Sequence, residues 1–208
     1  MKKILSAATS FLIAATSVFE ACPMNSGAKE TKNIENFESY TGNAALAKAY
    51  TANKNGDPLE LSLVSDSIDG SKALKYDYTL KNDGSGYCGA TKSIGKSDWS
   101  SYDGLTFMIN ADGSNNATTV QFVDSNGIHW ECSRNFSSQS GWIQIEIPFS
   151  EFKVADWESS KPASPDLKSV TEFSIYANKN DGTVPVVTGK AITTTATQST
   201  STTTTTTT

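Results

Sequence analysis

Ile143-Gln144-Ile145-Glu146-Ile147 alternates apolar and polar residues, as expected of a β-strand with one buried face. Clusters of Asn, Asp, Gly and Ser, which favour turns, separate this run from others like it. Short alternating strands joined by such turns predict an all-β fold, an antiparallel β-sandwich of jelly-roll type. The other clear alternating runs are residues 59–63, 74–78 and 105–109.

Strand parity assigns each residue of these runs to a face, because successive side chains of a strand alternate. Burying the three isoleucines of 143–147 turns Trp142 and Glu146 outward. The same rule turns Tyr176 outward at the end of its strand. One short helix is expected, over residues 44–49, as an insertion on the sandwich.

A hairpin is predicted around the turn at residues 124–127. Pairing Val123 with His129 places Gln121, His129 and Glu131 together on a polar outer face. A one-residue slip in register would exchange this set with the core set. The core set is Val120, Phe122, Trp130 and Cys132.

The chain has 208 residues, of which 37% are hydrophobic and 19% charged, a composition typical of a globular protein. Residues 33–190 make one domain of ordinary size, which we expect to be monomeric. The net charge of -5 argues against nucleic acid as a partner, because no excess of Lys or Arg is present to neutralise phosphates.

The two ends of the chain differ from the middle. Residues 1–21 start with Met-Lys-Lys, continue through an apolar stretch too short to span a bilayer and end in small residues, which predicts a signal peptide. Residues 22–32 are expected to be a short linker, with lipid attachment at Cys22 as the alternative. The Thr-rich residues 191–208 are expected to be a linker or a tail. The protein is therefore expected to be secreted or attached to the cell surface, without a transmembrane span.

Motifs for nucleophilic or zinc chemistry are missing from the sequence. The single histidine, His129, and the lack of a Gly-x-Ser-x-Gly elbow argue against a serine hydrolase. Cys22, Cys88 and Cys132 have no Cys-x-x-Cys spacing, which argues against zinc. By parity Cys88 and Cys132 both face the core, so they form either a disulfide or two packed thiols.

Exposed aromatic residues are more informative, because sugar rings stack on Tyr and Trp while amides and carboxylates bind hydroxyl groups. Tyr87, Trp157 and Tyr176 all fall on presumed outer faces or loops. A carbohydrate-binding surface carries aromatic and polar residues of this kind together.

Seven short pieces of the chain form an ordered series. They are Phe37-Glu38-Ser39-Tyr40, Asp69-Gly70-Ser71-Lys72-Ala73-Leu74, Gly86-Tyr87-Cys88-Gly89, Asp98-Trp99-Ser100, His129-Trp130, Gly141-Trp142 leading to Ile147-Pro148-Phe149-Ser150-Glu151-Phe152, and Phe173-Ser174-Ile175-Tyr176-Ala177-Asn178. In order and spacing they resemble family 11 carbohydrate-binding modules, jelly rolls that bind β-glucan and are attached to bacterial cellulases and mannanases. The resemblance implies a ligand cleft on a concave sheet.

The resemblance also implies which residues bind the glycan. Tyr87 and Tyr176 match tyrosines of the family's cleft, and Asp156-Trp157 resembles an Asp-Tyr pair whose stacking surface the Trp would keep. Polar neighbours would select the hydroxyl pattern by hydrogen bonding. The expected binding residues are Tyr87, Trp157, Tyr176, Asp156, Tyr50, Gln121, His129 and Asn126.

The chain departs from the family at two places. Cys88 stands where the family has Trp, which should affect packing more than binding. The family's closing strand supplies an acid to a structural calcium, and residues 184–190 lack this acid. Glu38 remains as a ligand for a structural calcium, and no cofactor is required.

We therefore expect a non-catalytic module that binds β-1,4-linked or mixed-linked β-glucan, or mannan or glucomannan, and targets an attached glycoside hydrolase to plant polysaccharide. One alternative is a small glycan hydrolase that uses Glu131 with Glu146 or Asp156, although neither these acids nor Glu158 show a catalytic spacing. The other alternative is a lectin-like surface adhesion protein.

Overall fold

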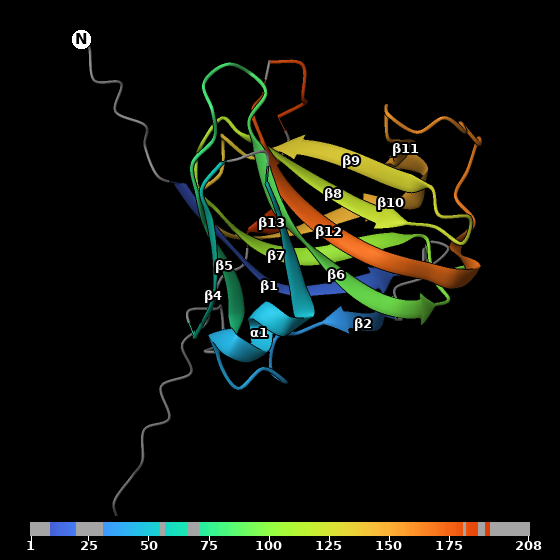
Figure 1. Cartoon of the computed structure of the whole chain (residues 1–208), viewed down its shortest axis with the longest axis horizontal. Coiled ribbons are helices and arrows are strands. Elements are labelled where there is room, and N and C mark those ends of the chain that lie inside the picture. The colour runs from blue at the N-terminus through green and yellow to red at the C-terminus, as the bar shows by residue number, and fades with distance from the viewer. Residues whose placement is uncertain are drawn as a thin grey trace, which may run out of the picture.

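The computed structural model describes residues 9–19, 31–54, 57–65, 71–180, 182–186 and 190–191. Two antiparallel sheets pack face to face (Figure 1), which confirms the predicted all-β sandwich. Sheet A runs in the order β13 (Lys190–Ala191), β10 (Gly141–Pro148), β7 (Gly104–Ala111), β1 (Thr9–Phe19), β5 (Ala73–Tyr78) and β4 (Leu59–Val64), with β2 (Thr31–Glu35) paired to β1. Sheet B runs in the order β11 (Lys153–Val154), β9 (His129–Asn135), β8 (Ala117–Val123), β12 (Val170–Asn178), β6 (Tyr87–Ser97) and β3 (Tyr50–Lys54).

The core lies between the two sheets and follows the predicted alternation. Along β10 the three isoleucines of 143–147 are buried, while Glu146 is exposed. Aromatic rings fill one end of the core, where Phe122 lies 5.0 Å from Phe152 and 5.6 Å from Trp99 between ring centroids. Each such pair adds about 0.5–1.5 kcal/mol to the stabilisation that burial of its area provides.

The predicted hairpin has the expected register. Val123 pairs with His129 and Gln121 with Glu131, so the polar set lies on the outer face of sheet B. Trp130 is buried in the core, where its Nε1–H donates to Asp124 Oδ2 at 2.9 Å. The alternative slip of one residue does not occur.

The predicted helix is α1 (Asn43–Ala49), and the 3₁₀ turns η1 (Phe149–Glu151) and η2 (Leu167–Ser169) are also present. The N-cap is Gly42, without a side-chain capping bond. The Asn43 side chain instead accepts from Leu63 N–H at 2.8 Å and thereby ties α1 to β4.

Cys88 and Cys132 are both buried and form no disulfide, which agrees with the alternative of two packed thiols. Cys88 lies on β6 and Cys132 on β9, with β12 and β8 between them. Three interstrand steps of about 4.8 Å separate the two strands by about 14 Å. Disulfides need Cα atoms within about 7 Å, so these thiols cannot meet.

The N-terminal apolar stretch forms β1, an interior strand of sheet A. Thr9–Phe19 pairs with β5 on one side and with β7 on the other. The signal peptide at 1–21 stays a prediction, and cleavage at its end would remove this strand from the sheet. Most of the linker at 22–32, Cys22 and the Thr-rich residues 192–208 lie outside the described residues.

Candidate functional site

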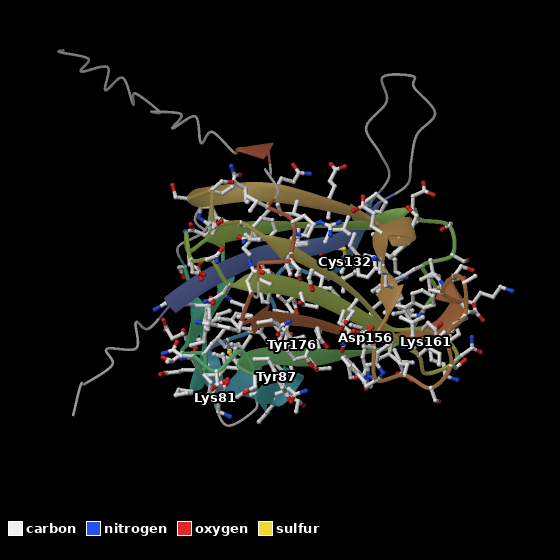
Figure 2. All side chains as sticks on the ribbon, turned by 90° about the horizontal axis from the view of Figure 1, so that it is seen from above. Lys81, Tyr87, Cys132, Asp156, Lys161 and Tyr176 are labelled. Atoms are coloured by element: carbon white, nitrogen blue, oxygen red, sulfur yellow. The ribbon has the colours of Figure 1, made fainter. Side chains whose placement is uncertain are left out.

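The outer face of sheet B is hollowed by a groove of about 590 Å³. Four neighbouring strands, β9, β8, β12 and β6, form its floor, and the loops at 84–86 and 155–158 border it. In Figure 2, Tyr87 and Tyr176 lie together toward one end, while Asp156 and Lys161 lie together toward the other. The lining residues of this groove are Asn53, Gly84, Ser85, Gly86, Tyr87, Thr119, Gln121, His129, Glu131, Trp157, Tyr176, Asn178 and Lys179.

Tyr176 forms part of the groove floor rather than a raised platform. Only 9% of the residue is exposed, because its ring lies over Gly89 on β6. A Cβ at Gly89 would lie 2.4 Å from Tyr176 Cδ1, so only glycine leaves room for the ring. Asn53 Nδ2 donates to the Tyr176 hydroxyl at 3.1 Å, and the hydroxyls of Thr91 and Tyr176 lie 3.3 Å apart.

Polar side chains continue the floor from Tyr176 toward β9. Thr119 is directly opposite Tyr176 in the strand pairing and Ser133 is opposite Thr119. The Thr119 and Ser133 hydroxyls are 2.7 Å apart, and Asn178 Nδ2 donates to Thr119 Oγ1 at 2.6 Å. This connected set of hydroxyl and amide groups presents both donors and acceptors to a ligand.

Glu131 places a carboxylate on the same floor. Burial raises its pKa, and the neighbouring Asp156 carboxylate acts in the same direction. Gln121 Nε2 donates to Glu131 Oε2 at 3.4 Å and opposes this rise. The groove therefore holds a partly desolvated acid beside a neutral amide.

Two aromatic residues reach solvent along the groove. Tyr87 is 37% exposed and contacts Tyr176 edge to face, with ring centroids 6.4 Å apart. Trp157 is 65% exposed, and its ring centroid lies 6.0 Å from that of His129. Flat apolar faces next to a polar floor match the two kinds of surface on a sugar ring.

The structure brings five of the eight predicted binding residues into this groove: Tyr87, Gln121, His129, Trp157 and Tyr176. Asp156 is exposed next to Trp157, at the groove edge. Asn126 lies outside the groove, exposed in the β8–β9 turn, where its N–H donates to Asp124 Oδ1 at 2.8 Å. The assignment of all these residues to glycan binding stays a prediction.

Tyr50 does not line the groove. It is buried, and its hydroxyl donates to Glu35 Oε2 at 3.1 Å. Tyr40 also donates to this carboxylate at 2.7 Å, and Lys92 forms an ion pair with it. Burial alone would raise the pKa of Glu35, but the bonds from Lys92, Tyr40 and the Phe37 N–H outweigh burial and lower it. Tyr50 thus contributes to a buried charged cluster.

Glu38, the predicted calcium ligand, is exposed and accepts from Lys72 N–H at 2.6 Å. Within the described ranges, no group of three or more His, Cys, Asp or Glu residues is arranged to hold a metal ion. A calcium at Glu38 stays a prediction.

Several groove residues were not predicted from the sequence as ligand contacts. Thr119 and Asn178 share strand faces with Gln121 and Tyr176, so parity would have found them. Parity assigns Glu131 to this face, and the only role that the sequence predicts for it is that of an acid in the hydrolase alternative. Asn53 comes from the edge strand β3, and no feature of the sequence places it next to Tyr176.

Comparisons with known proteins agree with this architecture. Residues 20–184 match the model of the carbohydrate binding domain of family 11. The chain is 32% identical over 126 residues to a mannan endo-1,4-beta-mannosidase of Bifidobacterium adolescentis, covering 61% of this chain and 12% of that protein. It is 28% identical over 167 residues to endoglucanase H of Acetivibrio thermocellus, covering 73% of this chain and 16% of that protein.

In the described ranges, no helix is long and apolar enough to cross a membrane.

The family match covers well over half of the chain and includes every strand of the groove floor. The chain therefore belongs to family 11 of the carbohydrate-binding domains.

Proposed function

We propose that the groove on sheet B binds a neutral β-linked glycan chain, either β-1,4-linked or mixed-linked β-glucan, or mannan or glucomannan. The observation that carries this proposal is the placement of Tyr87 and Trp157, both exposed, on one groove with a polar floor. Stacking on these rings would supply most of the affinity, and the floor would select the hydroxyl pattern.

Lys179 is a cation in the groove lining, but the carboxylate on the groove floor favours a neutral ligand there. Glu131 lies on the floor, and the exposed Asp156 carboxylate acts on it from the edge. An acidic polysaccharide would bring further negative charge next to a partly desolvated carboxylate, which is unfavourable. A hydroxyl group of a neutral sugar can instead donate to Glu131.

The domain would hold an attached glycoside hydrolase near its polymer and raise the local substrate concentration. The names of two relatives, a mannosidase and an endoglucanase, support this role, although this chain matches only a small part of each. The proposal includes secretion, a monomeric domain and a structural calcium at Glu38.

The raised pKa of Glu131 beside Asp156 favours glycan hydrolysis as a second candidate function. The other predicted pairing does not fit the geometry. Glu146 lies on the outer face of sheet A, on the opposite side of the sandwich from Glu131, so these two acids cannot flank one glycosidic bond. Release of reducing ends from soluble β-glucan by this chain would favour hydrolysis over simple binding.

Affinity electrophoresis tests the binding proposal directly. The full chain is run in gels that contain barley β-glucan, xyloglucan, glucomannan, xylan or no polysaccharide. We expect retardation in the β-glucan or glucomannan gel, and weaker retardation of Tyr87→Ala at an unchanged Tm. Free migration of the folded protein in every gel would contradict the proposal and favour the adhesion alternative.

A further inference from the structure

The loop that carries Trp157 is fastened to strand β9 through its backbone. Ala155 N–H donates to His129 O at 2.9 Å, and Glu158 N–H donates to Ala155 O at 3.0 Å. The chain therefore makes a tight turn over residues 155–158 at the end of the groove. Lys161 Nζ supports the turn by donating to the carbonyl oxygens of Ala155 and Asp156, at 2.6 and 3.1 Å.

A side-chain contact closes the same turn onto β9. Glu158 Oε1 lies 2.6 Å from His129 Nδ1 and accepts from the His129 backbone N–H at 3.1 Å. These bonds from His129 lower the pKa of Glu158. Because Nδ1 can carry a proton in neutral histidine as well as in the cation, the contact does not require a charged imidazole.

Trp157 lies between the two ends of this turn, and its ring is mostly exposed. An exposed ring takes its position mainly from the backbone that carries it, and stacking on a sugar requires that position to be held before binding. A loose turn would make the ligand bear the entropy cost of ordering the ring.

We propose that Glu158 is a positioning residue that latches the 155–158 turn to His129 and holds Trp157 for stacking on a sugar ring. The inference rests on the proposed glycan binding by the groove. It assigns to Glu158 a role in affinity without contact to the ligand.

A double-mutant cycle tests the inference by binding to soluble β-glucan. Glu158→Ala is expected to weaken binding about fivefold in the wild-type background and to have no further effect in the Trp157→Ala background. Glu158→Gln keeps an oxygen that accepts from His129 N–H and should recover part of the affinity. Glu60→Ala, an exposed residue on β4 of sheet A, is the matched control and should bind normally. Equal effects of Glu158→Ala in both backgrounds would overturn the inference.

A second measurement does not depend on any glycan. The indole N–H resonance of Trp157 can be assigned because it is missing in Trp157→Phe. Its ¹⁵N heteronuclear NOE should be close to the values of the backbone amides in the strands. Glu158→Ala should lower this value clearly, while Glu60→Ala should not. An unchanged NOE in Glu158→Ala would overturn the positioning role of Glu158 even if the wild-type chain binds glucan. If the Trp157 indole is ordered but the chain binds no glycan, only the proposed function would be contradicted.

Discussion

The outer faces of strands β8 and β10 show how differently the two sheets are used. On β10, in sheet A, Trp142 and Gln144 are half-buried and Glu146 is exposed, as on an ordinary solvated face. On β8, in sheet B, Thr119 and Gln121 are only 2% and 6% exposed although they too point away from the core. Sheet A therefore acts as a support, and sheet B carries a recessed polar surface that can bind a ligand.

The largest loss of stability should follow from removing strand β1 from sheet A. A chain that begins at Cys22 lacks β1 and leaves β5 and β7 with unpaired edges. The hydrogen bonds of β1 to both neighbours are lost, so we expect the free energy of unfolding to fall by about 5 kcal/mol or more, which lowers Tm by about 10 to 20 °C. Thermal melts of the two chains by circular dichroism would measure the difference, and equal Tm values would contradict an interior role for β1.

The second prediction concerns an ion pair that stabilises the fold but lies outside the groove. Lys92 forms an ion pair with buried Glu35 on the core side of β6, away from the groove. Lys92→Met would leave a buried charge without its partner and destabilise the fold by about 3 to 5 kcal/mol. Urea unfolding measures this loss, with exposed Lys96→Ala on the same strand as the control.

The pH dependence of this effect has a definite sign. The pKa of Glu35 is lowered in the fold, so its stabilisation is complete above the unfolded value of about 4.3. It is lost as the pH falls through the lowered folded pKa. The gap in stability between wild type and Lys92→Met should therefore narrow in acid, and a gap that widened below pH 4 would contradict the pairing.

The third prediction concerns Gly89, which leaves room for the Tyr176 ring in the groove floor. In Gly89→Ala the new Cβ would lie 2.4 Å from Ile175 O, a backbone atom, and as close to the Tyr176 ring. The ring must leave the groove floor or the strands must separate, and overpacking of this kind costs about 1 to 3 kcal/mol. We expect a lower Tm and loss of glucan retardation. Full binding by Gly89→Ala would show that the position of Tyr176 over β6 is unimportant.

The smallest expected effect is on affinity, and it comes from comparing two glutamines, one on the outer face of each sheet. Gln121→Ala removes a buried amide from the groove floor, whereas Gln144→Ala removes one from the outer face of sheet A. Loss of a neutral hydrogen bond to a sugar costs about 0.5 to 1.5 kcal/mol, a weakening of about two- to tenfold. Isothermal titration with a soluble β-glucan oligosaccharide should show this change for Gln121→Ala alone. Equal affinities of the two variants would contradict the division between the sheets.

Much of this contrast could be predicted from the sequence where the physics is local. Alternation identified the strands, and the turn at 124–127 fixed the pairing of Val123 with His129, which places Gln121 and Glu131 on the outer face. Parity gives the face of a residue but not its depth. It could not show that the face is recessed or that Tyr176 lies flat over Gly89.

Other parts of the site depend on contacts between segments far apart in the sequence. The family resemblance predicts Tyr50 as a binding residue, but its hydroxyl donates to Glu35 because β2, β3 and β6 meet there. Asn53 reaches Tyr176 across 123 positions of sequence. The contact between Glu158 and His129 likewise depends on the placement of a loop, which no local pattern specifies.

The most direct test of glycan binding on sheet B compares two tryptophans, one on the outer face of each sheet. Trp157 is exposed at the groove on sheet B, and Trp142 is half-buried on the outer face of sheet A. Titration of β-glucan into Trp157→Ala and Trp142→Ala should show at least tenfold weaker binding for the first and wild-type affinity for the second, consistent with about 1.5–3 kcal/mol for burial of a large apolar side chain. Wild-type affinity of Trp157→Ala together with weakened binding by Trp142→Ala would place the glycan on sheet A and contradict the account.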